Sequence, residues 1–198
     1  PWPAENLKEN PDRIAYWSDK LNKDYNKPNL LGEFGKSLYE EGKSESFLHN
    51  GIWAGLMSGV CATPLHWWGG QIAAQPENFS TFNETMMKQL KFLDTFIGEI
   101  DMAAHHFSPL YSAPAEEQMV LTGMPEGAVY GLKGDSLHLS WIYHVDEYSD
   151  QLFTGLKLTF PRMSNGWYKI CFYNTWSGQW YADTLQAQCL DGTLSIPI

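Results

Sequence analysis

The sequence predicts an α/β region followed by an all-β region. Apolar residues recur at helical spacing up to about residue 101, and short runs of alternating apolar and polar residues begin at about residue 116. The intervening segment MAAHHFSPLYSAPAEE has neither pattern. We therefore predict an α/β part over residues 1–101, a linker over 102–115 and an antiparallel β-sandwich over 116–198.

Composition limits the classes of ligand. The chain has 198 residues and a net charge of −10, which argues against nucleic acid and anionic membrane surfaces, because both are bound through clustered Lys and Arg. No apolar run has the length of a membrane span. Nine Trp, ten Tyr and ten Phe supply flat faces that suit neutral amphipathic ligands such as sugars.

Three helices are predicted in the first part. Asn10 and Pro11 are typical of a helix start, and the apolar stripe that follows ends before residues 26–28. Ser44 is the predicted N-cap of a glycine-rich helix over 45–59. Thr81 and Glu84 form a capping box for a third helix, which extends to about residue 97.

Two short apolar runs between these helices indicate buried strands. Asn29-Leu30-Leu31 precedes the stretch GEFG, and residues 61–68 end at a Gly-Gly pair. Helices alternating with such strands predict βαβ crossovers and a parallel sheet. Glu33 would then lie at the carboxyl end of a strand, where active sites are built, with Trp67 and Trp68 beside it. The alternative is a loop glutamate that caps a helix or faces solvent.

Two stretches of this part resemble a known family. KPNLLGEFG and HNGIWAGLMSGVCATPLHWWGG are similar to the last two βα units of the (β/α)8 barrel in cellulase- and mannanase-like retaining glycoside hydrolases. The resemblance covers residues 27–97. It implies a partial barrel for the α/β part, with the antiparallel β-sandwich after it.

The resemblance also implies roles for individual residues. Glu33 matches the catalytic nucleophile, and Trp67 or Trp68 matches the platform on which a sugar ring stacks. His66 and Asn50 are further candidates for substrate binding. His49, Asn50 and Trp53 match an HN-x-x-W pattern whose side chains serve packing and positioning. The implied substrate is a carbohydrate polymer or oligosaccharide, and no cofactor is implied.

A second carboxyl group is required by this chemistry. A retaining hydrolase places its general acid about 5 Å from the nucleophile, and in the family this residue follows an earlier strand that this chain lacks. A complete barrel takes about 250 residues. We therefore expect a missing N-terminal barrel segment, or a second copy of the chain, to complete the site and to cover the bare sheet edge. PWPAENLKENP at the start of the chain is no signal peptide, and secretion or a cell-surface location is inferred only from the polymeric substrate.

The second part of the sequence contains about seven predicted strands. They are MVLTGM, GAVYGLK, SLHLSWIYHV, LFTGLKLTF, GWYKICFYN, QWYADTLQAQCL and TLSIPI. NGWYKICFYNTWSGQW, residues 165–180, resembles a pattern in the domain that follows the catalytic domain in such hydrolases. Alternation predicts that Tyr168, Ile170 and Phe172 face the core. Trp176 and Trp180 are candidates for an accessory sugar platform or for packing against the first part.

Cysteine and histidine residues predict no metal site. Cys61, Cys171 and Cys189 show no metal-binding spacing, and buried free thiols are favoured over a Cys171–Cys189 disulfide. His105 and His106 lie in the linker, where hydrogen bonding is the expected role.

Two function hypotheses follow. The first is the C-terminal part of a retaining β-glycoside hydrolase that acts on a plant-type β-glycan of the cellulose or mannan class, with Glu33 as nucleophile. The second is a non-catalytic, carbohydrate-associated β-sandwich module, with the barrel remnant as a scaffold.

Overall fold

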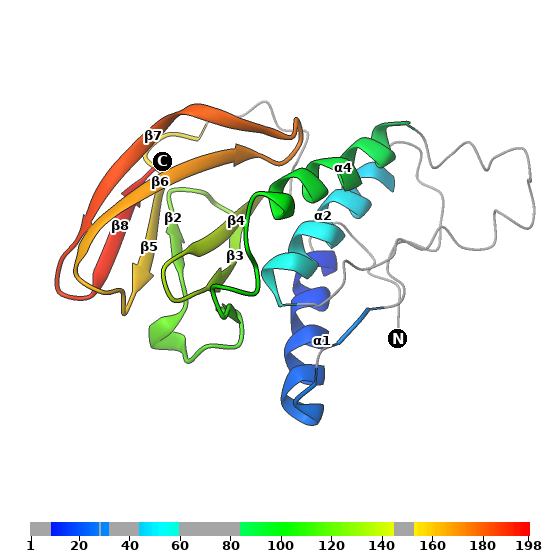
Figure 1. Ribbon diagram of the computed structural model, residues 1–198, viewed down its shortest axis with the longest axis horizontal. Helices are drawn as coiled ribbons and strands as arrows, with labels where there is room; N and C mark the ends of the chain where they lie inside the picture. The colour runs from blue at the N-terminus through cyan, green and yellow to red at the C-terminus, as the bar shows by residue number, and fades with distance from the viewer. Residues whose placement is uncertain (1–8, 28, 32–43, 60–83, 145–152) are drawn as a thin grey trace, which may run out of the picture.

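The computed structural model describes residues 9–27, 29–31, 44–59, 84–144 and 153–198 (Figure 1). Its helices are α1 (Glu9–Tyr25), α2 (Ser44–Met57), α4 (Glu84–Gly98) and the short 3-10 helix η2 (Ala115–Glu117). Its strands are β1 (Ser108–Pro109), β2 (Val120–Thr122), β3 (Gly127–Lys133), β4 (His138–His144), β5 (Lys157–Pro161), β6 (Gly166–Asn174), β7 (Gln179–Cys189) and β8 (Thr193–Pro197).

Helix α1 is amphipathic and has a defined end. Ile14 and Ala15 are fully buried, while the opposite side carries Lys20–Asp24 and Lys23–Asp19 ion pairs one turn apart. Asn26 terminates the helix in the left-handed region at φ 48°, and its N–H donates to the Asn22 carbonyl at 2.8 Å. The helix therefore stops before residue 28, as the sequence predicts.

Helix α2 is the centre of the helical layer. Every residue from 46 to 58 is buried, because α1, α4 and the strands β3 and β4 all contact this helix. The buried Asn10 of α1 donates a hydrogen bond to the Phe47 carbonyl of α2 at 3.1 Å. A helix that is apolar on all sides is expected in such a position.

Antiparallel pairing joins all the described strands. They form three small sheets with the strand orders β1-β3-β4, β2-β5-β8 and β6-β7. In the third sheet, which we call the ribbon, Gly166 pairs with Cys189 and Tyr173 pairs with Trp180, with a bulge between Cys171 and Tyr173. The ribbon arches over the other strands, and its turn reaches toward α4 (Figure 1).

The predicted partial barrel is wrong. No parallel strand pair occurs in the described part of the chain, and the protein is mixed α/β with small antiparallel sheets. The apolar composition of α2 predicts that this helix is buried, but it does not reveal the partner that buries it. That partner includes the antiparallel pair β3–β4. The predicted strand over residues 61–68 lies outside the described residues.

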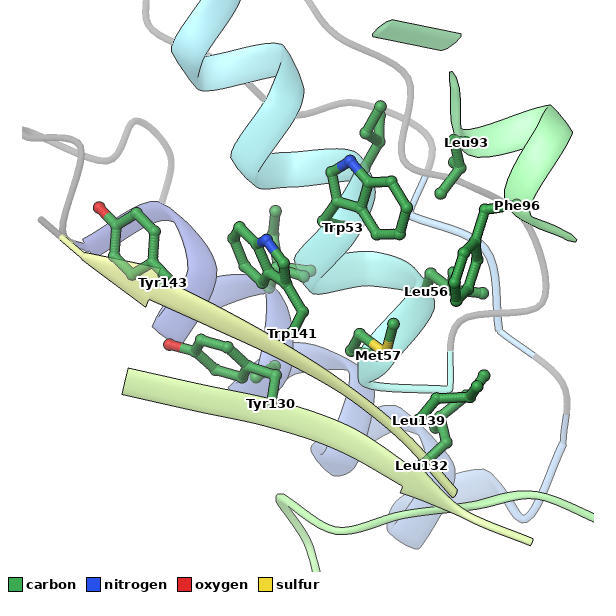
Figure 2. Packing of buried hydrophobic residues seen from close by; sticks show 14 of the residues in the cluster. Trp53, Leu56, Met57, Leu93, Phe96, Tyr130, Leu132, Leu139, Trp141 and Tyr143 are labelled. Carbon is green, nitrogen blue, oxygen red and sulfur yellow. The ribbon is translucent and has the colours of Figure 1, made fainter. Parts of the chain in front are cut away.

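Two hydrophobic clusters form the core. The larger one joins all three helices to β3 and β4, and Figure 2 shows Trp53 and Met57 of α2 beside Phe96 of α4 and Leu139 of β4. The smaller one lies among β5, β6, β7 and β8, where Tyr168 and Ile170 pack as alternation predicts. The larger cluster thus contains residues from both parts predicted from the sequence. No helix within the described ranges has the length and apolarity needed to cross a membrane.

Candidate functional site

The turn between β6 and β7 has a structure determined by its own sequence. We call residues 174–178, Asn-Thr-Trp-Ser-Gly, the docking turn. The Asn174 side-chain oxygen accepts hydrogen bonds from the backbone N–H groups of Trp176 and Ser177 at 3.0 and 3.1 Å. The Gly178 N–H donates to the Asn174 carbonyl at 2.8 Å. An asparagine that binds the backbone two residues on is a standard turn former.

Gly178 allows the docking turn to approach α4 closely. Its φ is +69°, and an added Cβ would overlap the ring of Phe92. Only glycine satisfies both the left-handed backbone and the absence of a side chain at this point. The turn sequence and the surface of α4 are therefore complementary.

His49 of α2 receives the docking turn. The side chain is buried, and its ring stacks on Trp176 with centroids 3.8 Å apart and planes 10° apart. Its Nε2 lies 3.2 Å from the Thr175 hydroxyl, and its Nδ1 lies 2.8 Å from Oε1 of Gln89. One buried imidazole thus connects α2, α4 and the ribbon.

The hydrogen-bond chain selects one form of the imidazole. Gln89 donates from Nε2 to a Glu45 carboxylate oxygen at 3.2 Å, so its Oε1 faces His49 and accepts from Nδ1–H. The bare Nε2 then accepts from the Thr175 hydroxyl. Burial lowers the pKa of His49 from 6.5 to about 4, and the hydrogen bond to Gln89 opposes this shift. His49 is therefore neutral at pH 7.

An aromatic cluster extends the contact beside His49. Tyr173 and Trp180 of the ribbon pack edge to face at 4.9 Å, and Phe96 of α4 lies 5.2 Å from Tyr173 and 5.6 Å from Trp180. Trp53 lies 5.2 Å from Phe96. The Tyr173 hydroxyl donates to the Phe92 carbonyl at 2.7 Å. These contacts hold the ribbon against the helices.

A cavity of about 500 Å³ lies between the helices, β4 and the ribbon. Aromatic side chains dominate its wall near the docking turn, among them Trp53, Phe96, Trp141 and Trp180, and Thr175 also lines it. This volume and this mixture of aromatic and polar groups are typical of sites for small organic ligands.

Most residues of the predicted sugar site lie outside the described residues. Glu33, His66, Trp67 and Trp68 all belong to this group, so their proximity to one another stays a prediction. Asn50 is described and is buried in α2 at 1% exposure. Its buried position agrees with a packing role more readily than with direct sugar contact.

The two tryptophans proposed as an accessory platform lie at the docking turn. Trp176 is 41% exposed and Trp180 is 38% exposed, although one ring covers His49 and the other covers Phe96. Both residues therefore pack against the helical layer. A role of their outer faces in sugar binding stays a prediction.

The contact of Thr175 and Gly178 with the helices was not anticipated from the sequence. Nothing in the pattern of residues 174–178 names His49 or Phe92 as a partner. A buried histidine on an apolar helix was the available signal, since such a group requires a polar partner.

The described residues hold no group of three His, Cys, Asp or Glu side chains that is able to bind a metal ion. His106 contacts Asp135 at 2.8 Å, and His105 contacts the Ser136 hydroxyl at 3.2 Å, so both linker histidines form hydrogen bonds. Cys171 and Cys189 are free thiols, one exposed and the other buried.

Comparison of the chain with protein-family models, curated proteins and solved structures finds no match. The likeness to retaining glycoside hydrolases thus depends on the sequence motifs alone.

Proposed function

We propose that the chain is the C-terminal part of a retaining β-glycoside hydrolase that acts on a plant-type β-glycan of the cellulose or mannan class. Glu33 is the nucleophile, and Trp67 and Trp68 form the wall on which a sugar ring stacks. The general acid comes from a segment outside this sequence.

One observation supports this proposal. The two segments that resemble the family separately, the HN-x-x-W pattern of α2 and the N-T-W-S-G pattern of the ribbon, contact each other through His49, Thr175 and Trp176. In both segments, a residue that the family pattern specifies, His49 in one and Thr175 in the other, takes part in this contact. A hydrolase with a closely packed accessory β region accounts for this pairing.

The chemistry assigned to Glu33 is nucleophilic. One carboxylate oxygen bonds to the anomeric carbon while the bond to the leaving oxygen breaks, and the leaving group departs with the electron pair. Water then hydrolyses the glycosyl ester. Stacking on an indole orients the sugar ring for both steps.

The test uses dinitrophenyl β-glycosides of glucose, mannose and xylose in which fluorine replaces the hydroxyl group next to the anomeric carbon. Dinitrophenolate leaves without protonation, so the missing general acid is not needed, and fluorine slows hydrolysis of the ester. We expect the intact mass to increase by one glycosyl group, with one equivalent of dinitrophenolate released. Glu33→Gln should abolish the increase, and equal labelling of this variant would contradict the assignment.

A second candidate is a non-catalytic, carbohydrate-associated β module. The exposed aromatic side chains of the ribbon favour it, since Trp167 and Tyr181 are 69% and 56% exposed. Binding of a glycan without any labelling of Glu33 would favour this second function.

A further inference from the structure

The outward face of the ribbon carries a row of side chains that the core does not use. Three cross-strand pairs form this row: Trp167 with Gln188, Lys169 with Gln186, and Cys171 with Thr184. All six residues are exposed, and Trp167 is the most exposed tryptophan among those described. We call this row the outer face.

Alternation explains why the outer face is free of the core. Tyr168 and Ile170 point to the opposite side of β6, where they pack in the smaller hydrophobic cluster. Opposed side chains are about 5 Å apart across the strands, and those of one strand are about 7 Å apart along it. The outer face is thus a strip longer than a single sugar ring, and it follows the curve of the ribbon (Figure 1).

Of the six residues that form the outer face, only Lys169 is charged. Asp183 is the acidic residue of these two strands, and it lies in β7 at the bulge, next to Thr184 of the outer face. The six side chains of the outer face offer one indole, two carboxamides, one hydroxyl, one thiol and one ammonium group. Within the described part of the chain, no hydrogen bond or ion pair engages the side chains of Lys169, Gln186 or Gln188.

These groups match a neutral glycan. The indole of Trp167 suits the C–H face of a sugar ring, and the carboxamides of Gln186 and Gln188 both donate to and accept from hydroxyl groups. Lys169 adds hydrogen-bond donors for hydroxyl oxygens. An apolar partner would leave these polar groups without hydrogen bonds, which is costly on burial.

We propose that the outer face binds a neutral β-linked polysaccharide, with Trp167 as the stacking platform and Gln186 and Gln188 as hydrogen-bonding groups. This inference rests on the proposed function only for the class of ligand, a β-linked polysaccharide. Binding at the outer face requires neither Glu33 nor hydrolysis. The face would keep the chain on its polymer while another site acts on it.

The experiment is native affinity electrophoresis of the full chain in gels that contain soluble glucan, mannan or xylan. We expect at least one polymer to retard the chain, and Trp167→Ala to lower the affinity about tenfold, the loss expected for one aromatic stacking contact. Trp167→Phe should retain part of the binding. Tyr25→Ala, at an exposed aromatic residue of α1, is the matched control and should bind normally.

Several outcomes would overturn this inference. The inference would fail if no neutral polymer retarded the chain, or if only charged polymers did so. It would also fail if Trp167→Ala bound as well as the original chain. Light scattering on the same samples tests whether a second copy of the chain binds the outer face. A dimer that Trp167→Ala converts to a monomer would make the outer face a self-association surface and overturn the proposal. Binding by Glu33→Gln separates the two proposals, since that variant should lose labelling and keep its retardation.

Discussion

The rings of His49 and Trp176 lie face to face, with centroids 3.8 Å apart, although one residue belongs to the central helix and the other to a hairpin turn near the C-terminus. Thr175 adds a hydroxyl contact to the same imidazole at 3.2 Å. Because the imidazole is neutral and buried, the contact is both an aromatic stack and a directed hydrogen bond. The ribbon is thereby attached to the helices at a specific position.

Removal of the stacking indole should loosen this attachment. We expect Trp176→Ala to lower the free energy of unfolding by about 1 to 2 kcal/mol, because the change removes one stacked contact and half-buried apolar area. Denaturant unfolding followed by circular dichroism measures the loss. Trp167→Ala is the control and should change stability by less than about 0.5 kcal/mol, because this indole is 69% exposed. Equal losses in the two variants would contradict the role given to Trp176.

A methyl group at Gly178 should be incompatible with α4. Gly178→Ala places Cβ against Phe92 at a φ of +69°, whereas Gly155→Ala meets no atom within 4 Å at a φ of +72°. Both variants incur the backbone cost of about 1 kcal/mol, so only the former adds the steric conflict. We expect the lower melting temperature for Gly178→Ala. Phe92→Ala introduced together with Gly178→Ala should remove most of the difference, and failure to do so would refute the steric explanation.

Acid should weaken the protein through His49. Its folded-state pKa of about 4 is below the usual 6.5, so between these pH values the unfolded chain holds a proton that the folded chain lacks. The contribution of His49 to stability is therefore complete above pH 6.5 and decreases as pH falls toward 4, by about 3 kcal/mol in total.

Other groups titrate in this range, so the effect of His49 is measured as a difference between the original chain and a His49 variant. Burial also lowers the pKa of His138, which contributes a loss of the same sign. Unfolding free energies of the original chain and of His49→Gln should be compared from pH 7 to pH 4. We expect the slope to be smaller for His49→Gln, and parallel curves would exclude His49 as a source of acid sensitivity.

A second long-range contact joins α1 to β3. The Tyr130 hydroxyl donates to an Asp12 carboxylate oxygen at 2.5 Å, and burial and this bond both raise the pKa of Tyr130. Tyr130→Phe and Asp12→Asn should each destabilise the fold, with a coupling energy of about 1 kcal/mol in a double-mutant cycle, because a hydrogen bond to a charged group is stronger than a neutral one. Independent effects of the two changes would show that the contact does not stabilise the fold.

Local sequence was sufficient for most of the helices and strands. The predicted runs GAVYGLK and GWYKICFYN coincide with β3 and β6, and Ser44, the predicted N-cap of the second helix, is the first residue of α2. Such signals depend on neighbours in the chain, namely periodicity, turn residues and caps, so a single sequence contains them.

Tertiary structure decided how these elements are assembled. Whether α2 packs on a parallel or an antiparallel sheet depends on residues distant in sequence, and its apolar surface suits either. The same is true of the docking turn. Asn174 and Gly178 determine its shape locally, but its contacts with Phe92 and His49 exist only because the ribbon folds back over the helices. Sequence by itself determined the helices, the strands and the shape of the turn. Long-range packing alone decided the sheet pairing and the site, because the hydrophobic effect specifies how much surface is covered and not which partner covers it.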